Sequence, residues 1–238
     1  MVTYNGHNLG DLLFIGDPDF SIANSKADTL EVSGKDGETV RGMRFGPSAV
    51  SFSAALTGSA ADRRNALSQL AMWLDVDKPK ALVLPDTPDR YYLAVPDGPL
   101  DIQRAMYADL FTLGFKITDP AAYGQEKQLI MRDVTSMNFT VGGTYPTKPE
   151  IQGGVTRDAT SKIWGVRLDG GDFIHVPLSS DSGRAVKLNC ADRTCTVAGA
   201  ASLPTLDSDW FEFTPGNHTL LMDNGTGTIT VSWRERWL

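Results

Sequence analysis

The three histidines are the first residues to test for chemistry, because imidazole can bind a metal or act as a general base. His7, His175 and His218 lie far apart in this chain of 238 residues. The sequence has no His-x-His pair, no His-Glu-x-x-His helix motif and no Gly-x-Ser-x-Gly element for a hydrolase serine. His175 lies in an alternating stretch, and we expect its ring to point outward. The sequence predicts no metal centre, no cofactor and no enzymatic activity.

Close carboxylate pairs offer a second kind of chemistry, since two carboxylates across a cleft can serve as the acid and base of a glycosidase. Three candidate pairs stand beside Pro or Ser, where Asp is common as a turn former. We therefore interpret the pairs as turn residues rather than catalysts. No Asp-x-Asp-x-Asp-Gly calcium loop is present. The pairs are Asp17/Asp19, Asp86/Asp89 and Asp207/Asp209.

The two cysteines allow two interpretations. If Asp192-Arg193 forms a two-residue hairpin turn, Cys190 and Cys195 lie directly opposite each other, where a cross-strand disulfide can form. The alternative, which we favour, is a pair of free thiols on a hairpin made in a reducing compartment. Without a neighbouring histidine, the two thiols cannot build a zinc site of the usual type.

Aromatic side chains of the C-terminal half could form a platform for stacking a sugar ring. Trp164 and Trp210 are the candidates for such a glycan contact. In a β-domain of this size, however, most aromatic side chains belong to the core. We keep glycan binding as the alternative function.

Charge and hydropathy exclude several classes of function. The formal net charge is −7, and the sequence contains no run of Lys and Arg that could grip phosphates. We expect no specific nucleic-acid binding. No apolar run approaches the roughly 20 residues that span a bilayer. The first residues lack a basic region followed by an apolar core, so we expect no signal peptide and synthesis in a cytoplasm.

The first part of the chain predicts a small α+β domain over residues 1–137. Ser59 can cap a helix over residues 60–75, in which Leu67, Leu70 and Leu74 share one face. Around it we expect strands, the clearest of which is Phe111–Ile117, where apolar and other residues alternate strictly. Asp119-Pro120 then ends that strand. The other expected strands are 50–56, 81–84 and 91–95.

A glycine- and charge-rich segment between Leu30 and Val50 predicts a long hairpin that protrudes into solvent or onto a neighbouring subunit. Its Gly34-x-x-Gly37-x-Thr39 spacing lacks the Gly-Lys-Ser/Thr ending of a phosphate loop. We assign the segment a role in subunit contact. The candidate interface residues are Gly34, Lys35, Asp36, Gly37, Arg41, Arg44 and Phe45.

Residues 138–238 predict a second, all-β domain. A stiff Gly- and Pro-containing linker around Tyr145 introduces about seven short strands at regular spacing, which is typical of a β-sandwich. Asp169–Asp172 and Asp223–Gly225 are the expected hairpin turns. The expected strands are 163–168, 173–178, 185–190, 194–197, 210–213, 219–223 and 228–233.

Several segments in order resemble one known family. They are the hairpin, the Ser-capped helix that ends in Leu-Ala-Met-Trp-Leu, Leu84–Tyr92, the Phe115–Gly124 segment, Gly143-Thr-Tyr-Pro-Thr, and the terminal Trp-Arg-Glu-Arg-Trp-Leu. This order resembles the distal tail proteins of long-tailed, non-contractile bacteriophages over essentially the whole chain.

The resemblance implies a hexameric ring at the tip of the tail tube. The first domain would build the ring, and a galectin-like β-sandwich would project from it. The ring would contact the tail tube protein, the tail-associated protein and receptor-binding proteins, and the genome would pass through its lumen. Such proteins are made in the host cytoplasm and end in the virion. Longer relatives carry carbohydrate-binding insertions, for which this chain has no room.

Overall fold

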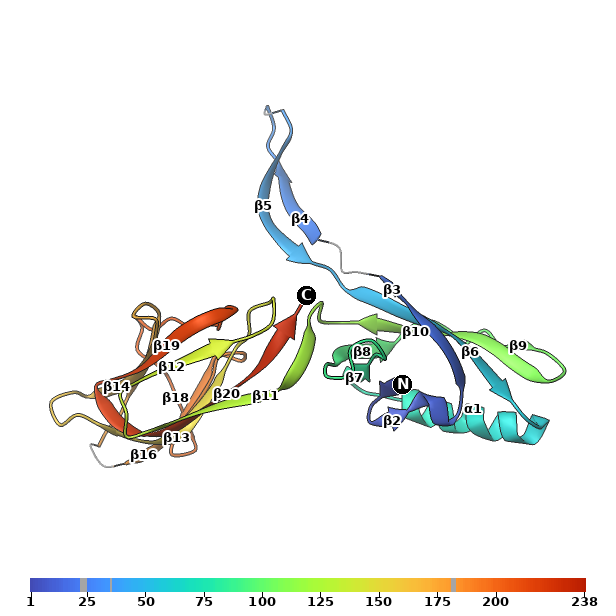
Figure 1. The fold of residues 1–238 in the computed structure, drawn as a ribbon. Coiled ribbons are helices and arrows are strands. Elements are labelled where there is room, and N and C mark those ends of the chain that lie inside the picture. Colours follow the sequence, from blue (N-terminus) through green and yellow to red (C-terminus); the bar gives the residue numbers. More distant parts are fainter. Residues whose placement is uncertain (22–24, 35, 181–182) are drawn as a thin grey trace. The chain divides into compact units, whose positions relative to one another are not determined.

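The computed structural model describes residues 1–21, 25–34, 36–180 and 183–238 (Figure 1). Within these residues the chain is mainly β, with one α-helix and four sheets, which confirms the predicted fold class. The chain divides into two compact units, Met1–Ala122 and Tyr123–Leu238. None of the described helices has the length and apolar character needed to cross a membrane.

An eight-stranded antiparallel sheet forms the centre of the first unit. Its order is β2-β1-β7-β8-β10-β6-β3, and β9 pairs with β10. The central strands β6 and β10 alternate buried and more exposed residues, as expected for a sheet with one covered face. The strand predicted over Phe111–Ile117 is confirmed within β10. The strands are β1 (Thr3–Tyr4), β2 (His7–Asn8), β3 (Phe14–Ser21), β6 (Ser48–Thr57), β7 (Lys80–Val83), β8 (Tyr92–Pro96), β9 (Gln103–Arg104) and β10 (Ala108–Ile117).

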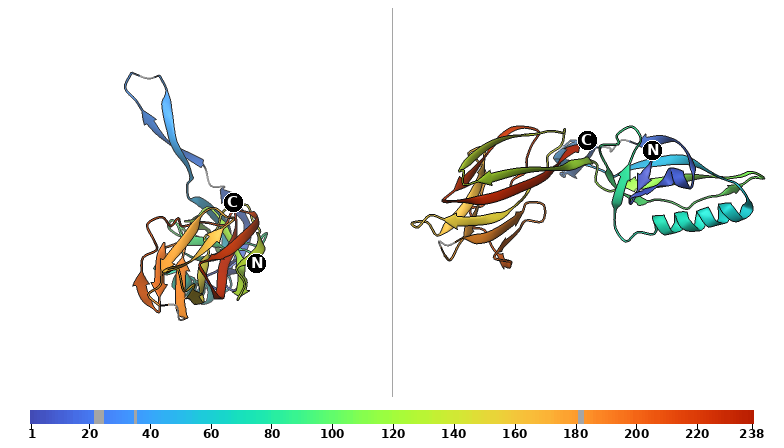
Figure 2. Two further views of the ribbon diagram at one scale, coloured as in Figure 1. Left: turned by 90° about the vertical axis from the view of Figure 1, so that its left-hand side faces the viewer. Right: turned by 60° about the horizontal axis from the view of Figure 1, so that its bottom comes forward.

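The single described α-helix, α1 (Ala60–Leu74), lies against one face of this sheet (Figure 2). Ser59 and Asp62 form a capping box, in which each backbone N–H donates to the side chain of the other at 3.2 Å. These bonds satisfy N–H groups that the first helical turn leaves without partners. Leu70 is buried in the core between helix and sheet. The predicted cap and helix are confirmed. A short 3-10 helix, Leu9–Asp11, follows β2.

Aromatic side chains fill much of this core. The rings of Tyr4 and Phe115 are 4.8 Å apart, and those of Phe52 and Phe115 are 6.2 Å apart. The Tyr4 hydroxyl donates a hydrogen bond to the Ala94 carbonyl at 3.2 Å. Burial raises the pKa of Tyr4 to about 12, so this hydroxyl remains a donor well into the alkaline range.

A separate two-stranded sheet, the hairpin β4 (Ser25–Glu31) and β5 (Glu38–Phe45), interrupts the chain between β3 and β6 (Figure 1). The segment between Leu30 and Val50, for which the sequence predicted a long hairpin, contains β5 and the turn, whereas most of β4 lies before it. Its register shifts between Asp28 and Thr29, because Asp28 pairs with Gly42 and Thr29 with Val40.

Two sheets make up the second unit. The six-stranded sheet has the order β11-β20-β13-β16-β17-β18, and the four-stranded sheet has the order β12-β19-β14-β15. The strands are β11 (Ala122–Arg132), β12 (Ser136–Val141), β13 (Glu150–Arg157), β14 (Ile163–Leu168), β15 (Phe173–Pro177), β16 (Arg184–Asn189), β17 (Thr194–Val197), β18 (Ala200–Ser202), β19 (Gly216–Asp223) and β20 (Gly225–Trp237).

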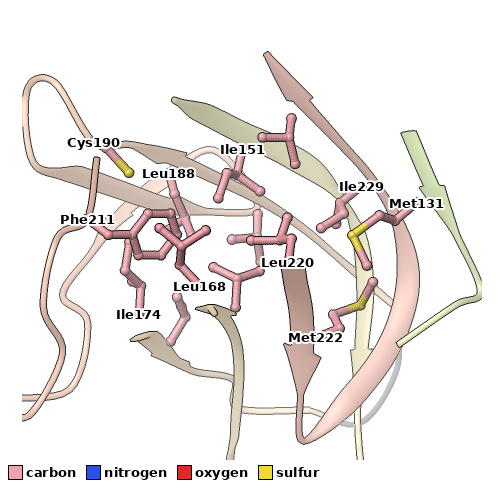
Figure 3. Packing of buried hydrophobic residues seen from close by; sticks show 14 of the residues in the cluster. Met131, Ile151, Leu168, Ile174, Leu188, Cys190, Phe211, Leu220, Met222 and Ile229 are labelled. Carbon is pink, nitrogen blue, oxygen red and sulfur yellow. The ribbon is translucent and has the colours of Figure 1, made fainter. Parts of the chain in front are cut away.

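One apolar core lies between these two sheets (Figure 3). Ile151, Leu188 and Ile229 come from the six-stranded sheet, and Leu168 and Leu220 from the four-stranded sheet. Packing of two sheets around a shared core defines a β-sandwich. The predicted sandwich is therefore present.

Two local predictions in this unit are wrong. Residues 210–213 do not form a strand; Phe213 makes an isolated bridge to Thr147 instead. Asp223–Gly225 is not a hairpin within one sheet, because β19 and β20 belong to different sheets. Asn224, with a φ of +57°, turns the chain from one layer of the sandwich to the other.

The expected boundary after residue 137 differs from the observed division after Ala122. Position 137 lies inside β12, which pairs with β19. The preceding strand β11 pairs with β20. Both strands therefore belong to the sandwich. The exposed middle of β11 shows no apolar alternation that would have linked this strand to the following ones in the sequence.

The terminal Trp-Arg-Glu-Arg-Trp segment holds the start of the second unit in place. The Arg236 guanidinium lies over the rings of Tyr123 and Tyr145, at 5.0 and 4.9 Å. Gly143 has a φ of +88°, and a Cβ there would overlap the Arg236 carbonyl oxygen. The Glu235 carboxylate accepts a hydrogen bond from the Gly142 N–H at 3.0 Å. These contacts explain why the linker is rich in glycine.

Candidate assembly interface

The β4–β5 hairpin is exposed on both faces. Every residue of its two strands is exposed, which no other strand pair longer than two residues shows in the described chain. A two-stranded hairpin with no covered face is marginally stable in water. We therefore interpret the hairpin as a segment that is stabilised by packing against a partner.

The register divides the hairpin into two chemically different faces. Side chains alternate along β4, so those of Ser25, Ala27, Thr29 and Glu31 share one face with their cross-strand partners. On β5 these partners include Val40, Met43 and Phe45, which form an apolar row. Met43 is 67 % exposed and Val40 is 56 % exposed. We call this face the apolar face of the hairpin.

Like charges oppose each other at both ends of the hairpin. Lys26 pairs with Arg44 near the base, and Glu31 pairs with Glu38 near the tip. Like charges directly across a ladder destabilise a strand pair. A partner surface with complementary charges would relieve both repulsions.

Six of the seven predicted interface residues lie in the described part of this hairpin. Gly34 and Gly37 have φ values of +83° and +81° in the turn at the tip, where Asp36 is also exposed. Arg41 is the extra residue of the register shift, since its neighbours Val40 and Gly42 are the ones that pair. Arg44 and Phe45 point to opposite faces. Lys35 lies outside the described residues.

The two cysteines are buried, free thiols that do not oppose each other. Cys195 pairs with Leu188, while Cys190 lies in the turn, so the turn is longer than the Asp192-Arg193 turn that the sequence predicted. Asn189 makes this possible, because its side-chain carbonyl accepts hydrogen bonds from the N–H groups of two turn residues. Burial raises the pKa of Cys190 to about 12 and also raises the pKa of Cys195. Neither thiol is poised to react.

The proposed sugar platform is not supported by the tryptophan positions. Trp164 is 0 % exposed and belongs to the core of the sandwich. Trp210 is half-buried and packs against the same core. A buried ring cannot stack on a sugar, so the prediction for Trp164 is wrong.

His175 is also buried, contrary to the expectation that its ring points outward; it is 8 % exposed. Its Nε2 lies 3.2 Å from the carboxylate of Asp223, which also accepts hydrogen bonds from Arg167 at 2.8 and 2.9 Å. Arg167 in turn covers the ring of Phe173. This network ties β14, β15 and β19 together, with His175 and Arg167 both bonded to the same carboxylate oxygen of Asp223.

His218 forms a second such pair. Its Nδ1 lies 2.6 Å from the Asp169 carboxylate, and its Nε2 lies 2.6 Å from the Thr214 carbonyl oxygen. Because a carbonyl oxygen can only accept, Nε2 carries the proton. Burial raises the pKa of Asp169, but hydrogen bonds from His218 and the Thr219 N–H outweigh it, and the pKa is lowered overall. The carboxylate is thus held as a structural anion.

The carboxylate pairs lie in two kinds of local structure. Asp86 and Asp207 lie in turns, as expected. A hydrogen bond from Thr205 lowers the pKa of Asp207. Asp17 and Asp19 lie in β3 rather than a turn, because an edge strand tolerates the intervening Pro18 at a register shift. Among the described residues, no group of three His, Cys, Asp or Glu side chains is arranged to hold a metal ion.

Neither of the two His–Asp pairs was predicted from the sequence. Asp223 lies 48 positions from His175, and Asp169 lies 49 positions from His218. Each pair forms only when strands from distant parts of the chain come into register. Spacing within a motif therefore could not have revealed them.

Comparison with known families covers both units. Residues 5–117 match the phage tail protein RIFT-related domain, and residues 142–237 match the C-terminal domain of the siphovirus-type tail component. A search of the curated proteins found no significant match.

Solved structures show the same fold. The crystal structure of the Dit protein of phage SPP1, described as a paradigm of the hub adsorption apparatus in phages that infect Gram-positive bacteria, superimposes with a TM-score of 0.80. Its sequence is 19 % identical, and the match covers 100 % of this chain and 98 % of that chain. The baseplate of phage P2 in its activated conformation with Ca gives a TM-score of 0.50 at 9 % identity, over 94 % of this chain and 90 % of that chain.

The two matched domains and the fold define a structural component of a siphovirus tail. Such a component is part of the tail of the virion. More particularly, the chain belongs to the distal tail protein family, whose members are hub components of the phage baseplate. The family predicted from the order of the sequence motifs is confirmed.

Proposed function

We propose that this distal tail protein forms a hexameric ring that joins the tail tube to the tail-tip and host-adsorption apparatus. The first unit builds the ring. The second unit, a sandwich of the galectin-like type, projects from it toward the tail-associated and receptor-binding proteins. The ring assembles in the host cytoplasm and becomes part of the virion.

The observation that carries this proposal is the exposed hairpin β4–β5. Its apolar face bears Val40, Met43 and Phe45, and its ends bear like-charged cross-strand pairs. Both features are unfavourable in an isolated subunit. In a ring, each hairpin lies on the next copy. Such a head-to-tail contact is heterologous, and it closes when the rotation between neighbours divides a full turn.

The net charge of −7 fits the passage of DNA through the ring. An acidic lumen repels the phosphate backbone, so the genome can move through without being held. The same balance of charge argues against specific binding of nucleic acid.

The test is an interface variant on the apolar face of the hairpin. Replacing Val40 and Met43 by Ser removes two exposed apolar side chains without changing a charge. We expect the fraction of protein in rings, measured by multi-angle light scattering and negative-stain micrographs, to fall at least tenfold at equal concentration. Thermal unfolding of the sandwich should not change.

Leu30→Ser with Thr39→Ser is the matched control, since both residues lie on the opposite face of the same hairpin. This control should assemble like the unmodified protein. Normal rings from the Val40→Ser, Met43→Ser variant would refute the assignment of the interface. A protein that stays monomeric at every concentration, alone and with its tail tube protein, would refute the ring itself.

A further inference from the structure

The edges of the two sheets in the second unit differ in how they are protected. The six-stranded sheet ends at β11 and β18, and the four-stranded sheet ends at β12 and β15. An exposed edge presents unpaired N–H and C=O groups that can template pairing with another chain. Proteins therefore shorten, charge or cover the edges that are not meant to pair.

Three of the four edges show such protection. A loop covers β15: the N–H groups of Thr205 and Asp209 donate to the carbonyls of His175 and Phe173 at 2.9 Å each. β11 carries the charged residues Glu126 and Lys127 in an exposed stretch. β18 has three residues, which is too short to template a strand.

The fourth edge, β12, has none of these devices. Its six residues, Ser-Met-Asn-Phe-Thr-Val, contain no charge and no proline. β12 pairs with β19 without a bulge, from Ser136 opposite Leu221 to Val141 opposite Gly216. Within the described parts of the chain, no backbone hydrogen bond reaches the other side of β12.

The solvent-facing side of β12 carries a row of uncharged polar groups held in fixed positions. The Thr140 hydroxyl donates to the side-chain carbonyl of Asn217 at 2.7 Å, and the Thr219 hydroxyl donates to that of Asn138 at 2.8 Å. Because the side-chain carbonyls of both asparagines accept these bonds, their amide N–H groups point away from the two hydroxyls. The four side chains line a hollow of about 450 Å³, together with parts of Phe139 and His218.

The other side of β12 is apolar. Met137 and Phe139 are half-buried and pack against the core of the sandwich. An added strand would continue both rows, with its polar side chains beside Asn138 and Thr140 and its apolar side chains beside Met137 and Phe139. Side chains two residues apart in a strand repeat at about 6.8 Å, which is the same repeat as that of the polar row.

We propose that β12 is a docking site for an extended segment of a partner protein, which adds to the four-stranded sheet as a fifth strand. The segment alternates small polar side chains, such as Ser, Thr and Asn, with apolar ones. It carries no charge, because β12 itself has none and His218 on the neighbouring strand β19 is already bonded to Asp169. Main-chain hydrogen bonds supply the affinity, and the two rows of side chains set the register.

The proposal can be tested on the full-length protein with an acetylated, amidated Thr-Val-Asn-Val-Thr-Val peptide as the probe. Hydrogen–deuterium exchange of residues 136–141 is measured with and without the peptide. We expect exchange in β12 to slow at least fivefold and exchange in β11 to stay the same. A peptide with proline at its third position should give no protection, because it lacks a donor and breaks the added ladder.

Two variants separate edge pairing from general binding. Thr140→Lys places a charge on the β12 edge and should weaken peptide binding at least tenfold, whereas Gln125→Lys on the β11 edge is the matched control and should not. Asn138→Ser keeps the edge uncharged and should retain peptide binding. Thermal unfolding of each variant shows whether a loss of binding comes from misfolding instead. Equal binding to Thr140→Lys, or protection at β11, would overturn the proposal. Slow exchange in β12 that depends on protein concentration without peptide would show that a second copy occupies the edge, and would also overturn it.

Discussion

Gly165 shows how a single residue supports the polar network of the sandwich. In the register it lies between His175 on β15 and Asp223 on β19. The His175 ring reaches across it to the Asp223 carboxylate. A Cβ at this position would overlap the His175 ring and lie 2.7 Å from the Ile174 carbonyl oxygen. The glycine thus provides the space in which a buried histidine reaches its partner.

Gly165→Ala should therefore destabilise the second unit by about 1–3 kcal/mol, the usual range for an overpacked site. The measurement is urea unfolding followed by tryptophan fluorescence. Gly154→Ala is the matched control, because Gly154 also lies in a strand and its added Cβ would meet no atom within 4 Å. An equal loss of stability in both variants would show that strand glycines, and not the His175 ring, set the effect.

At the scale of elements, the sequence predicted the helices and strands that have a strong local pattern of apolar and capping residues. The α1 helix followed from its Ser cap and its apolar spacing, and β10 followed from the alternation of Phe111 to Ile117. β3 and β13 were missed. β3 contains Gly16 and Pro18 at its register shift, and β13 contains Gly153 and Gly154, so neither shows a clear period of two.

Ser59→Ala tests the cap of α1. The change removes the hydroxyl that accepts from the Asp62 N–H, and we expect the first unit to lose about 1 kcal/mol of stability. Ser68→Ala is the control, since Ser68 lies exposed in the same helix and Ala favours a helix interior. Chemical unfolding of the two variants, followed by circular dichroism, measures the difference. A cap variant as stable as the control would mean that tertiary packing alone holds the helix.

At the scale of the whole molecule, the position of the boundary follows from strand pairing. Residues 123–137 contribute most of β11, which flanks β20, and the first residues of β12. Met131 of β11 is fully buried in the core of the sandwich. A sandwich that begins after residue 137 would lack this strand and would leave part of its core uncovered.

A fragment of residues 123–238 should therefore fold, and a fragment of residues 138–238 should not. The longer fragment should unfold cooperatively on heating, and the shorter one should aggregate or unfold without a sharp transition, because it exposes the surface that Met131 covers. Differential scanning calorimetry and the near-ultraviolet circular dichroism of the tryptophans distinguish the two outcomes. A cooperative transition of equal midpoint in the shorter fragment would restore the boundary at residue 137.

The sequence by itself determined the helix and its cap, the strands with strict alternation, the division into a helix-containing part and an all-β part, and the family. These features depend on neighbours within a few residues or on the order of motifs. Only the tertiary structure decided that Trp164 and His175 are buried, that Cys190 does not oppose Cys195, and that β11 and β12 belong to the sandwich. It also decided that β12 is the edge left without protection. Each of these depends on which distant strands pair and in which register, and that register is set by packing of the core as a whole.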